Sequence, residues 1–280
     1  MQLKSILILL LVFSCIMPVN ATNNGDVRLN IIYMGQNLSH DSFTGGNISK
    51  NIFLENYIPK TNLTDKIIFI ARFGTPMITI GNGSEPKVMI IAGVHGNELP
   101  AQIAAIKMAN YLKNKNINGT VYIIPVVSPW GTSQNMRYWN GKNLNSVANN
   151  PGTPTNTILR YANDLKVNMI GDFHSTQPGS YPGNYSVLCS KHPLYESYNM
   201  AVNISNHTNS SLISYDRAGV DYPGAVEDMS NLEGIPAVTC EVLSPHGTAN
   251  SETIDRSFNQ MLTFLKFGNV ILKFKLTMNN

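Results

Sequence analysis

The chain has 280 residues, of which 43% are hydrophobic and 13% are charged, and its formal net charge at pH 7 is +3. This content suffices for a sizeable buried core, and an α/β domain of this length need not be divided in two. Because the basic residues are spread along the chain, no stripe forms that could track phosphates, and we expect no nucleic-acid partner.

The first 21 residues have the pattern of a signal peptide. Lys4 precedes an apolar stretch of 14 residues from Ile6 to Val19, and a small-residue cleavage site follows at Ala21. The stretch is shorter than the roughly 20 residues that a membrane-spanning helix needs. We therefore expect a secreted or cell-surface protein, with an uncleaved N-terminal anchor as the alternative.

Asparagine sequons and cysteines also bear on export. Nine Asn-x-Ser/Thr sequons follow the cleavage site, although an Asn-rich chain produces many by chance. They are at Asn37, Asn47, Asn62, Asn82, Asn118, Asn184, Asn203, Asn206 and Asn209. Only Cys189 and Cys240 remain after cleavage, which excludes a disulfide scaffold. We expect two unpaired buried thiols, with a single disulfide as the alternative.

The order of elements predicts an α/β fold. Residues 22–66 are polar, Asn-rich and weakly periodic, so we interpret them as an N-terminal extension beside a main domain at 67–268, with a tail at 269–280. Short β-branched runs predict buried strands at Lys66–Phe73, Lys87–Val94, Thr120–Val127, Val167–Phe173 and Ile235–Val242. Helical patterns lie at Leu99–Asn114, Thr155–Leu165, Pro193–Ile204 and Glu252–Lys266. This alternation favours a parallel or mixed sheet with helices on both faces.

Two histidines and a carboxylate follow predicted strands, at the strand ends where ligands collect in open α/β sheets. His95 comes after KVMIIAGV, His174 comes after VNMIGDF, and Glu98 lies three residues beyond His95. Two imidazoles and one carboxylate form the ligand set of a catalytic zinc site that keeps a position open for water. The His-x-x-Glu spacing alone is a weak signal. Asp172, two residues before His174, is a candidate to orient the imidazole, and a loop aspartate that caps a turn is an equally good interpretation.

Four segments carry a resemblance to a known family: AGVHGNE, SPWGTSQNMRYWNGKNLN, GDFHST and GIPAVTCEV, in this order. In these motifs the chain resembles the zinc carboxypeptidase superfamily, and within it the branch of succinylglutamate desuccinylase and aspartoacylase, over residues 74–267. The resemblance implies an α/β fold with a mixed, largely parallel eight-stranded sheet flanked by helices. It also implies one zinc ion (Zn2+) per chain, bound by His95, Glu98 and His174.

The resemblance further assigns two catalytic residues. Glu241 matches the family's general base, which takes a proton from the zinc-bound water and delivers it to the leaving nitrogen. Its place at the end of an apolar run agrees, because a partly desolvated carboxylate is a better base. Arg137 matches the arginine that stabilises the developing oxyanion, a charge that a fixed guanidinium suits. A solvent-exposed salt-bridge arginine is the alternative interpretation of Arg137.

One position departs from the family's pattern. Where the family usually has Asn-Arg, this chain has Asn145-Ser146, and the family's arginine grips the terminal carboxylate of the substrate. Serine cannot form a charged bidentate clamp. Either Lys142, Arg160 or Arg217 supplies the charge from another direction, or the substrate has no free carboxylate at that place.

Further candidates for substrate binding surround Glu241 in the sequence. Tyr215 and Tyr222 lie where carboxypeptidases carry a mobile tyrosine that closes over the substrate, and with Asn145 they form our predicted substrate-binding set. The segment DYPG is also a reasonable turn on which Tyr222 merely packs. His246 follows Glu241 closely enough to reach the same pocket, and a loop histidine without a functional role is the alternative.

These features predict an exported zinc-dependent amide hydrolase. The leading hypothesis is a metallocarboxypeptidase-type peptidase that trims short peptides, including the peptide stems of a cell-wall polymer. The second is an N-acyl amino acid amidohydrolase of desuccinylase or aspartoacylase type, although such metabolites are cytoplasmic. The third is a non-catalytic binding module on the same fold, against which the retained ligands, Glu241 and Arg137 argue. The sequence leaves the oligomeric state open.

Overall fold

The computed structural model describes residues 27–32 and 43–271. The predicted signal peptide at 1–21 and most of the predicted tail at 269–280 lie outside these residues. The strands of the described residues are β1 (Val27–Ile32), β2 (Thr75–Ile80), β3 (Lys87–Ala92), β4 (Thr120–Ile124), β5 (Met169–Thr176), β6 (Ser186–His192), β7 (Ser211–Arg217) and β8 (Ala237–Leu243).

All these strands belong to one eight-stranded sheet with the order β1-β2-β4-β3-β5-β8-β6-β7. The central strands β4, β3, β5 and β8 pair in parallel, as do β6 and β7. The pairs β1-β2, β2-β4 and β6-β8 are antiparallel. The predicted mixed, largely parallel eight-stranded sheet is confirmed.

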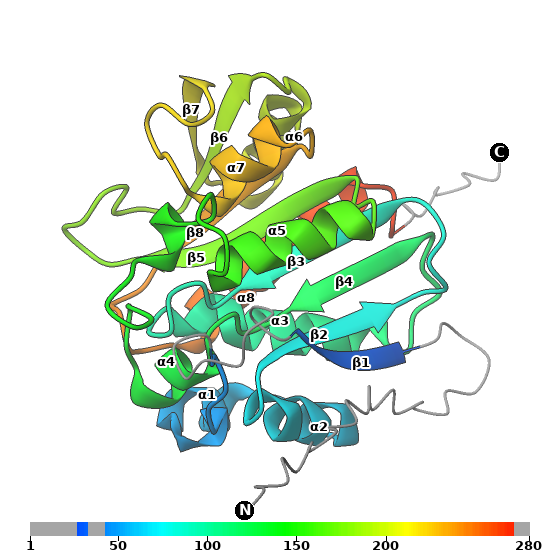
Figure 1. The fold of residues 1–280 in the computed structure, drawn as a ribbon, viewed down its shortest axis with the longest axis vertical. Coiled ribbons are helices and arrows are strands. Elements are labelled where there is room, and N and C mark those ends of the chain that lie inside the picture. Colours follow the sequence, from blue (N-terminus) through cyan, green and yellow to red (C-terminus); the bar gives the residue numbers. More distant parts are fainter. Residues whose placement is uncertain (1–26, 33–42, 272–280) are drawn as a thin grey trace, which may run out of the picture.

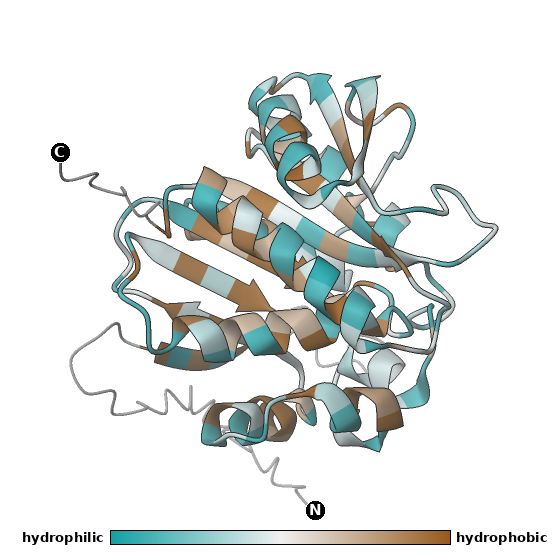
Figure 2. Cartoon of the chain, turned by 180° about the vertical axis from the view of Figure 1, so that it is seen from behind, coloured by the Kyte–Doolittle hydropathy of each residue, from teal (hydrophilic) through white to brown (hydrophobic). Residues whose placement is uncertain are grey.

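Helices cover both faces of the sheet (Figure 1). They are α1 (Ile52–Tyr57), α2 (Asn62–Ala71), α3 (Leu99–Leu112), α4 (Pro129–Gln134), α5 (Pro154–Asp164), α6 (Glu196–Thr208), α7 (Val226–Leu232) and α8 (Ser251–Phe267), with short 3-10 turns η2 (Ile48–Lys50) and η3 (Leu144–Ser146). Helices α3, α6 and α8 pack with one apolar cluster, and α5 and α7 pack with another on the opposite face. Figure 2 shows apolar and polar segments alternating along the helices, as expected where one side of each helix is buried.

Successive side chains of the central strands belong alternately to the two apolar clusters. In β3, Val88 and Ile90 join the cluster under α3 and α8, whereas Met89 and Ile91 join the cluster under α5. Successive side chains of a strand point to opposite faces, so a continuous apolar run requires cover on both sides. This is why the run KVMIIA forms a central strand that ends beside polar loops.

The predicted strand at Lys66–Phe73 is wrong, because residues 66–71 belong to helix α2 and a turn follows at 72–73. Its β-branched residues suggested a strand, but the buried residues Leu63, Ile67 and Ala71 are spaced four apart, as on one helix face. Thr61 caps the helix by accepting a hydrogen bond from the Thr64 backbone N–H. The neighbouring strand is β2, whose residues are all buried.

The predicted N-terminal extension contributes directly to the sheet. Strand β1 pairs with β2 at the sheet edge, with Val27 opposite Ile80 and Ile32 opposite Thr75. Helix α1 and the start of α2 come from the same part of the chain. The described part of residues 22–66 is therefore built into the fold.

Two further features complete the fold. Cys189 and Cys240 are buried and unpaired, which confirms the predicted free thiols. No helix within the described residues has both the length and the apolar character needed to cross a membrane.

Candidate active site and metal centre

The loop between β3 and α3 carries His95 and Glu98, and Glu98 is the N-cap residue of α3. The loop passes so close to the start of α4 that a Cβ atom on Gly96 would lie 2.2 Å from the carbonyl carbon of Gly131. The Gln102 amide donates hydrogen bonds to the backbone carbonyls of His95, Gly96 and Glu98 at 3.1–3.2 Å. The first turn of α3 thus fixes the loop that carries two predicted ligands.

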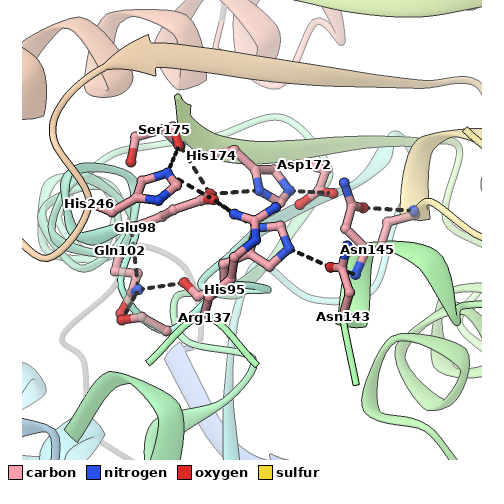
Figure 3. Close-up of polar contacts among 12 residues, drawn as sticks. His95, Glu98, Gln102, Arg137, Asn143, Asn145, Asp172, His174, Ser175 and His246 are labelled. Carbon is pink, nitrogen blue, oxygen red and sulfur yellow. Dashed lines mark hydrogen bonds and ion pairs between the residues drawn. The ribbon is translucent and has the colours of Figure 1, made fainter. Parts of the chain in front are cut away.

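Glu98 lies between the two predicted histidine ligands (Figure 3). Its Oε1 is 2.8 Å from His95 Nδ1, and its Oε2 is 2.8 Å from His174 Nδ1. One ligand atom from each of the three buried residues lies within 4.8 Å of the others. Two imidazole nitrogens and one carboxylate oxygen form a donor set that suits zinc and leaves a coordination position open.

The outward-facing ring nitrogens of both histidines are held by neighbouring side chains. His95 Nε2 lies 2.7 Å from Asn143 Oδ1, and His174 Nε2 lies 2.8 Å from Asp172 Oδ2. Because both oxygens accept, each Nε2 donates a hydrogen bond, and each Nδ1 is the ring nitrogen that faces Glu98 and is available to a metal. The predicted position of Asp172 beside His174 is confirmed, whereas sequence reasoning missed Asn143.

The charges within the cluster stabilise one another. Burial raises the pKa of Glu98, but His95 and His174 outweigh burial and hold this pKa well below its usual range. Burial lowers the pKa of His174, but Asp172 and Glu98 outweigh it and hold this pKa well above its usual range. The Ser175 backbone N–H adds a 3.1 Å hydrogen bond to Glu98 Oε2. The carboxylate at the centre is therefore ionised and ready to bind a cation.

Glu241 reaches the same site from strand β8. It is the register partner of His174 on β5, so the two residues lie side by side in the parallel pair. Its Oε2 is buried without a hydrogen-bond partner among the described residues. Burial, followed by the negative charge of Glu98, raises the pKa of Glu241 to about 8. A carboxyl group with a free oxygen and a raised pKa is suited to accept and release a proton near neutral pH.

Arg137 and His246 extend from loops toward Glu98. Arg137 Nη1 donates a 2.7 Å hydrogen bond to Glu98 Oε1. His246 Nε2 lies 3.0 Å from the Ser175 carbonyl oxygen and 3.6 Å from Glu98 Oε1. Both side chains line the cavity over the cluster, so His246 reaches the pocket as the sequence suggested.

The predicted substrate-binding residues line this cavity, which has a volume of about 340 Å3. Asn145 Oδ1 accepts a 3.3 Å hydrogen bond from the Val226 backbone N–H, at the start of α7. Tyr215 OH lies 2.9 Å from Tyr181 OH and 3.4 Å from Tyr222 OH. The structure therefore brings Asn145, Tyr215 and Tyr222 to one cavity and adds Tyr181, which the sequence reasoning missed.

The side chains proposed to replace the family's carboxylate-binding arginine do not line this cavity. Lys142, Arg160 and Arg217 are exposed and absent from its wall. Ser146 is exposed and donates its hydroxyl hydrogen bond to the Asn143 carbonyl oxygen at 2.9 Å. Arg137 is thus the only Lys or Arg side chain of the cavity wall formed by the described residues.

A buried acid in the wall, Glu227, was also missed by sequence reasoning. Glu227 lies on α7, which the sequence did not predict, and no motif marks it. A larger groove of about 1320 Å3 runs along α6 and α8, but none of the predicted site residues lines it. We therefore assign the chemistry to the smaller cavity, which His95, Glu98 and Glu241 line and beside which His174 completes the candidate metal-binding cluster.

Comparisons with solved structures support the same fold. The chain aligns with a succinylglutamate desuccinylase from a Silicibacter species at a TM-score of 0.60 and 16% identity, covering 93% of this chain and 72% of that chain. A succinylglutamate desuccinylase/aspartoacylase from Rhodobacter sphaeroides gives 0.55 and 19%, covering 71% and 60%. A metallo-carboxypeptidase from Burkholderia cenocepacia gives 0.51 and 16%, covering 69% and 60%. At these identities the likeness shows the fold alone, and the chain spans less than two thirds of the last two structures.

Sequence comparison identifies the family. No curated protein matches the chain. The family model described as the succinylglutamate desuccinylase/aspartoacylase catalytic domain matches residues 84–267, which include all three metal-binding candidates and Glu241. The chain therefore belongs to the succinylglutamate desuccinylase/aspartoacylase family of hydrolases.

Proposed function

We propose that the chain is an exported zinc-dependent amide hydrolase of metallocarboxypeptidase type, which trims short peptides or peptides of a cell-wall polymer. One observation carries the proposal: His95, Glu98 and His174 form a cluster beside a cavity that His95, Glu98 and Glu241 line. A metal-binding triad beside a carboxyl group with a free oxygen is the arrangement that hydrolysis of an amide requires.

The residues of the site have different roles in this proposed reaction. His95, Glu98 and His174 would hold a zinc ion, which would supply Lewis acidity toward the substrate carbonyl and toward water. Glu241 accepts the proton of the attacking water on its free Oε2 and passes it to the leaving nitrogen. Arg137 donates hydrogen bonds to the carbonyl oxygen as negative charge develops there.

The lack of a second arginine in the cavity favours, within the peptidase proposal, a peptide that is cut at an internal amide. An N-acyl amino acid and a peptide that is cut at its C-terminal residue both carry a free carboxylate close to the scissile amide, and a clamp for that group calls for a fixed cation. Arg137 is already assigned to the carbonyl oxygen, and Ser146 offers no charge. An internal amide needs no such clamp.

A second candidate function is hydrolysis of an N-acyl amino acid. It is supported by the family match and by the fold shared with a succinylglutamate desuccinylase. In that case, Arg137 would have to bind the carboxylate of the substrate as well as the developing oxyanion.

Export is part of the proposal and is supported by the N-terminal apolar segment, which lies outside the described residues. Six sequon asparagines of the described residues are exposed and would accept a glycan in a host that glycosylates: Asn62, Asn82, Asn118, Asn184, Asn206 and Asn209. Expression with the leader in a native-like host, followed by mass determination of the protein in medium and cell fractions, tests this part. A full-length cytoplasmic chain would contradict export.

The activity is tested by incubating the zinc-loaded protein with short peptides, wall-derived peptides and N-acyl amino acids, with products identified by mass spectrometry. Loss of residues from peptides supports the peptidase. Release from N-acyl amino acids alone supports the second candidate. Zinc binding without turnover of any amide would point to a non-catalytic binding module and would overturn the proposal.

A further inference from the structure

The active-site cavity contains a buried carboxyl group that the steps above do not use. Glu227 is 4% exposed, lies in the first turn of α7 and lines the same cavity as Glu241. Its Oε1 accepts a 2.8 Å hydrogen bond from the Ser190 backbone N–H. The adjacent Asp228 accepts from the Ser190 hydroxyl and the Gly219 N–H, both at 2.7 Å. Two neighbouring carboxyl groups are thus fixed between α7 and β6, and of the two Glu227 lines the cavity.

These two carboxyl groups have no cationic partner among the described residues. Neither Glu227 nor Asp228 forms an ion pair with a Lys, Arg or His among the residues that the structure describes. A buried carboxylate without a cation is costly. Burial, followed by Asp228, accordingly raises the pKa of Glu227 well above its usual range. A cation that entered the cavity would favour the ionised form and would supply the missing partner.

The surroundings of Glu227 suit a particular kind of cation. Leu188 and Ala225 line the same cavity and are themselves buried, so they offer apolar surface beside the carboxyl group. An aliphatic stem can lie along such surface while its charged end contacts the acid. A carboxylate of the substrate at this place would lie beside the carboxyl group of Glu227, which does not favour it. Among the described residues, Arg137 is the only Lys or Arg side chain that lines the cavity, and it is bound to Glu98.

We propose that Glu227 is a specificity-determining residue that binds an ammonium or guanidinium group at the end of an aliphatic side chain of the substrate. The substrate class is therefore an amide with a lysine-like or arginine-like residue next to the scissile bond. This inference rests on the proposed amide-hydrolase function and narrows its substrates. A charge-assisted hydrogen bond between Glu227 and the cation provides the selectivity.

The test compares N-acetylated dipeptides that carry lysine, norleucine or Nε-acetyllysine on either side of the scissile amide. Norleucine keeps the four-carbon stem of lysine but lacks the ammonium group. With the full-length, zinc-loaded protein we expect kcat/KM for the lysine substrate to exceed that for norleucine by at least about tenfold, or ~1.4 kcal/mol. Glu227→Gln should abolish this preference, so that the lysine and norleucine substrates give similar kcat/KM values. Glu233→Gln, an exposed change at the end of the same helix, should leave the preference intact.

The outcomes separate this inference from the proposed function. Equal rates for lysine and norleucine in the wild-type protein would overturn the inference and leave amide hydrolysis standing, even if Glu227→Gln does not fold. If no amide is hydrolysed, the proposed function fails, and calorimetry with pentylamine and 1-pentanol decides the inference. Tighter binding of pentylamine that Glu227→Gln removes would support it, and equal binding of the two would overturn it.

Discussion

Asp172 should control how tightly the metal centre binds zinc. This residue is fully buried, and its Oδ2 accepts the hydrogen bond from His174 Nε2 at 2.8 Å. Its Oδ1 has no partner among the described residues. In Asp172→Asn, the amide oxygen can still accept from His174, so the change removes the negative charge while the packing is preserved.

The magnitude follows from this geometry. Removing a residue that orients a metal-binding histidine typically weakens metal affinity by about 10- to 100-fold, or ~1.4 to 2.8 kcal/mol. We expect the upper half of this range for two reasons. The charge acts on His174 in a site without solvent screening. The new amide nitrogen also replaces the unpartnered Oδ1 and becomes a buried donor without an acceptor.

The assay is competition for zinc with a chromophoric chelator at neutral pH, applied to the wild type and Asp172→Asn. The matched control is Asp255→Asn, because Asp255 lies on the surface, where it pairs with Lys107. Circular dichroism and thermal melting establish that both variants are folded. A zinc Kd for folded Asp172→Asn equal to that of the wild type would refute the reasoning.

Three further predictions concern the general base, the pH dependence of zinc binding and the buried cysteines. Glu241→Gln should bind zinc normally and lower kcat by about 10²- to 10⁴-fold, and a fully active zinc-loaded variant would show that Glu241 is not the base. Burial lowers the pKa of His174, but its carboxylate neighbours outweigh burial and raise it; the metal-free protein therefore holds a proton that zinc must displace, and chelator competition should show weaker zinc binding as pH falls. An affinity independent of pH would contradict this reasoning. Burial raises the pKa of Cys189 to about 12, and Cys240 is fully buried, so a thiol-reactive dye should label at most one of the three cysteines until the protein is unfolded. Labelling of two or more in the folded protein would disprove the burial of these thiols.

The strands that could be predicted from the sequence are those that are buried on both faces of the sheet. Strand β3 is buried on both faces, so KVMIIA reads as a continuous apolar run. His95, His174 and Glu241 lie at or near the ends of such strands, and parallel pairing brings those ends together. The metal-binding cluster was therefore predictable from strand ends and motifs.

Other parts depend on contacts that local patterns do not reveal. Strand β7 is polar and largely exposed at the sheet edge, so it has no apolar run to mark it. Asn143 reaches His95 across 48 residues of sequence, and Glu227 becomes a cavity residue only because α7 packs beside β6. In α2 the β-branched composition competed with helical spacing, and packing of Ile67 against the core decided the outcome.

The measurement that tests the central claim most directly is the zinc content of the purified protein, determined by mass spectrometry of the metal and compared between the wild type and His174→Ala. The claim is that His95, Glu98 and His174 form a catalytic zinc centre. It predicts about one zinc ion per wild-type chain and loss of both zinc and amide hydrolysis in the folded variant. A wild-type protein that binds no zinc, or a variant that retains it fully, would contradict the claim.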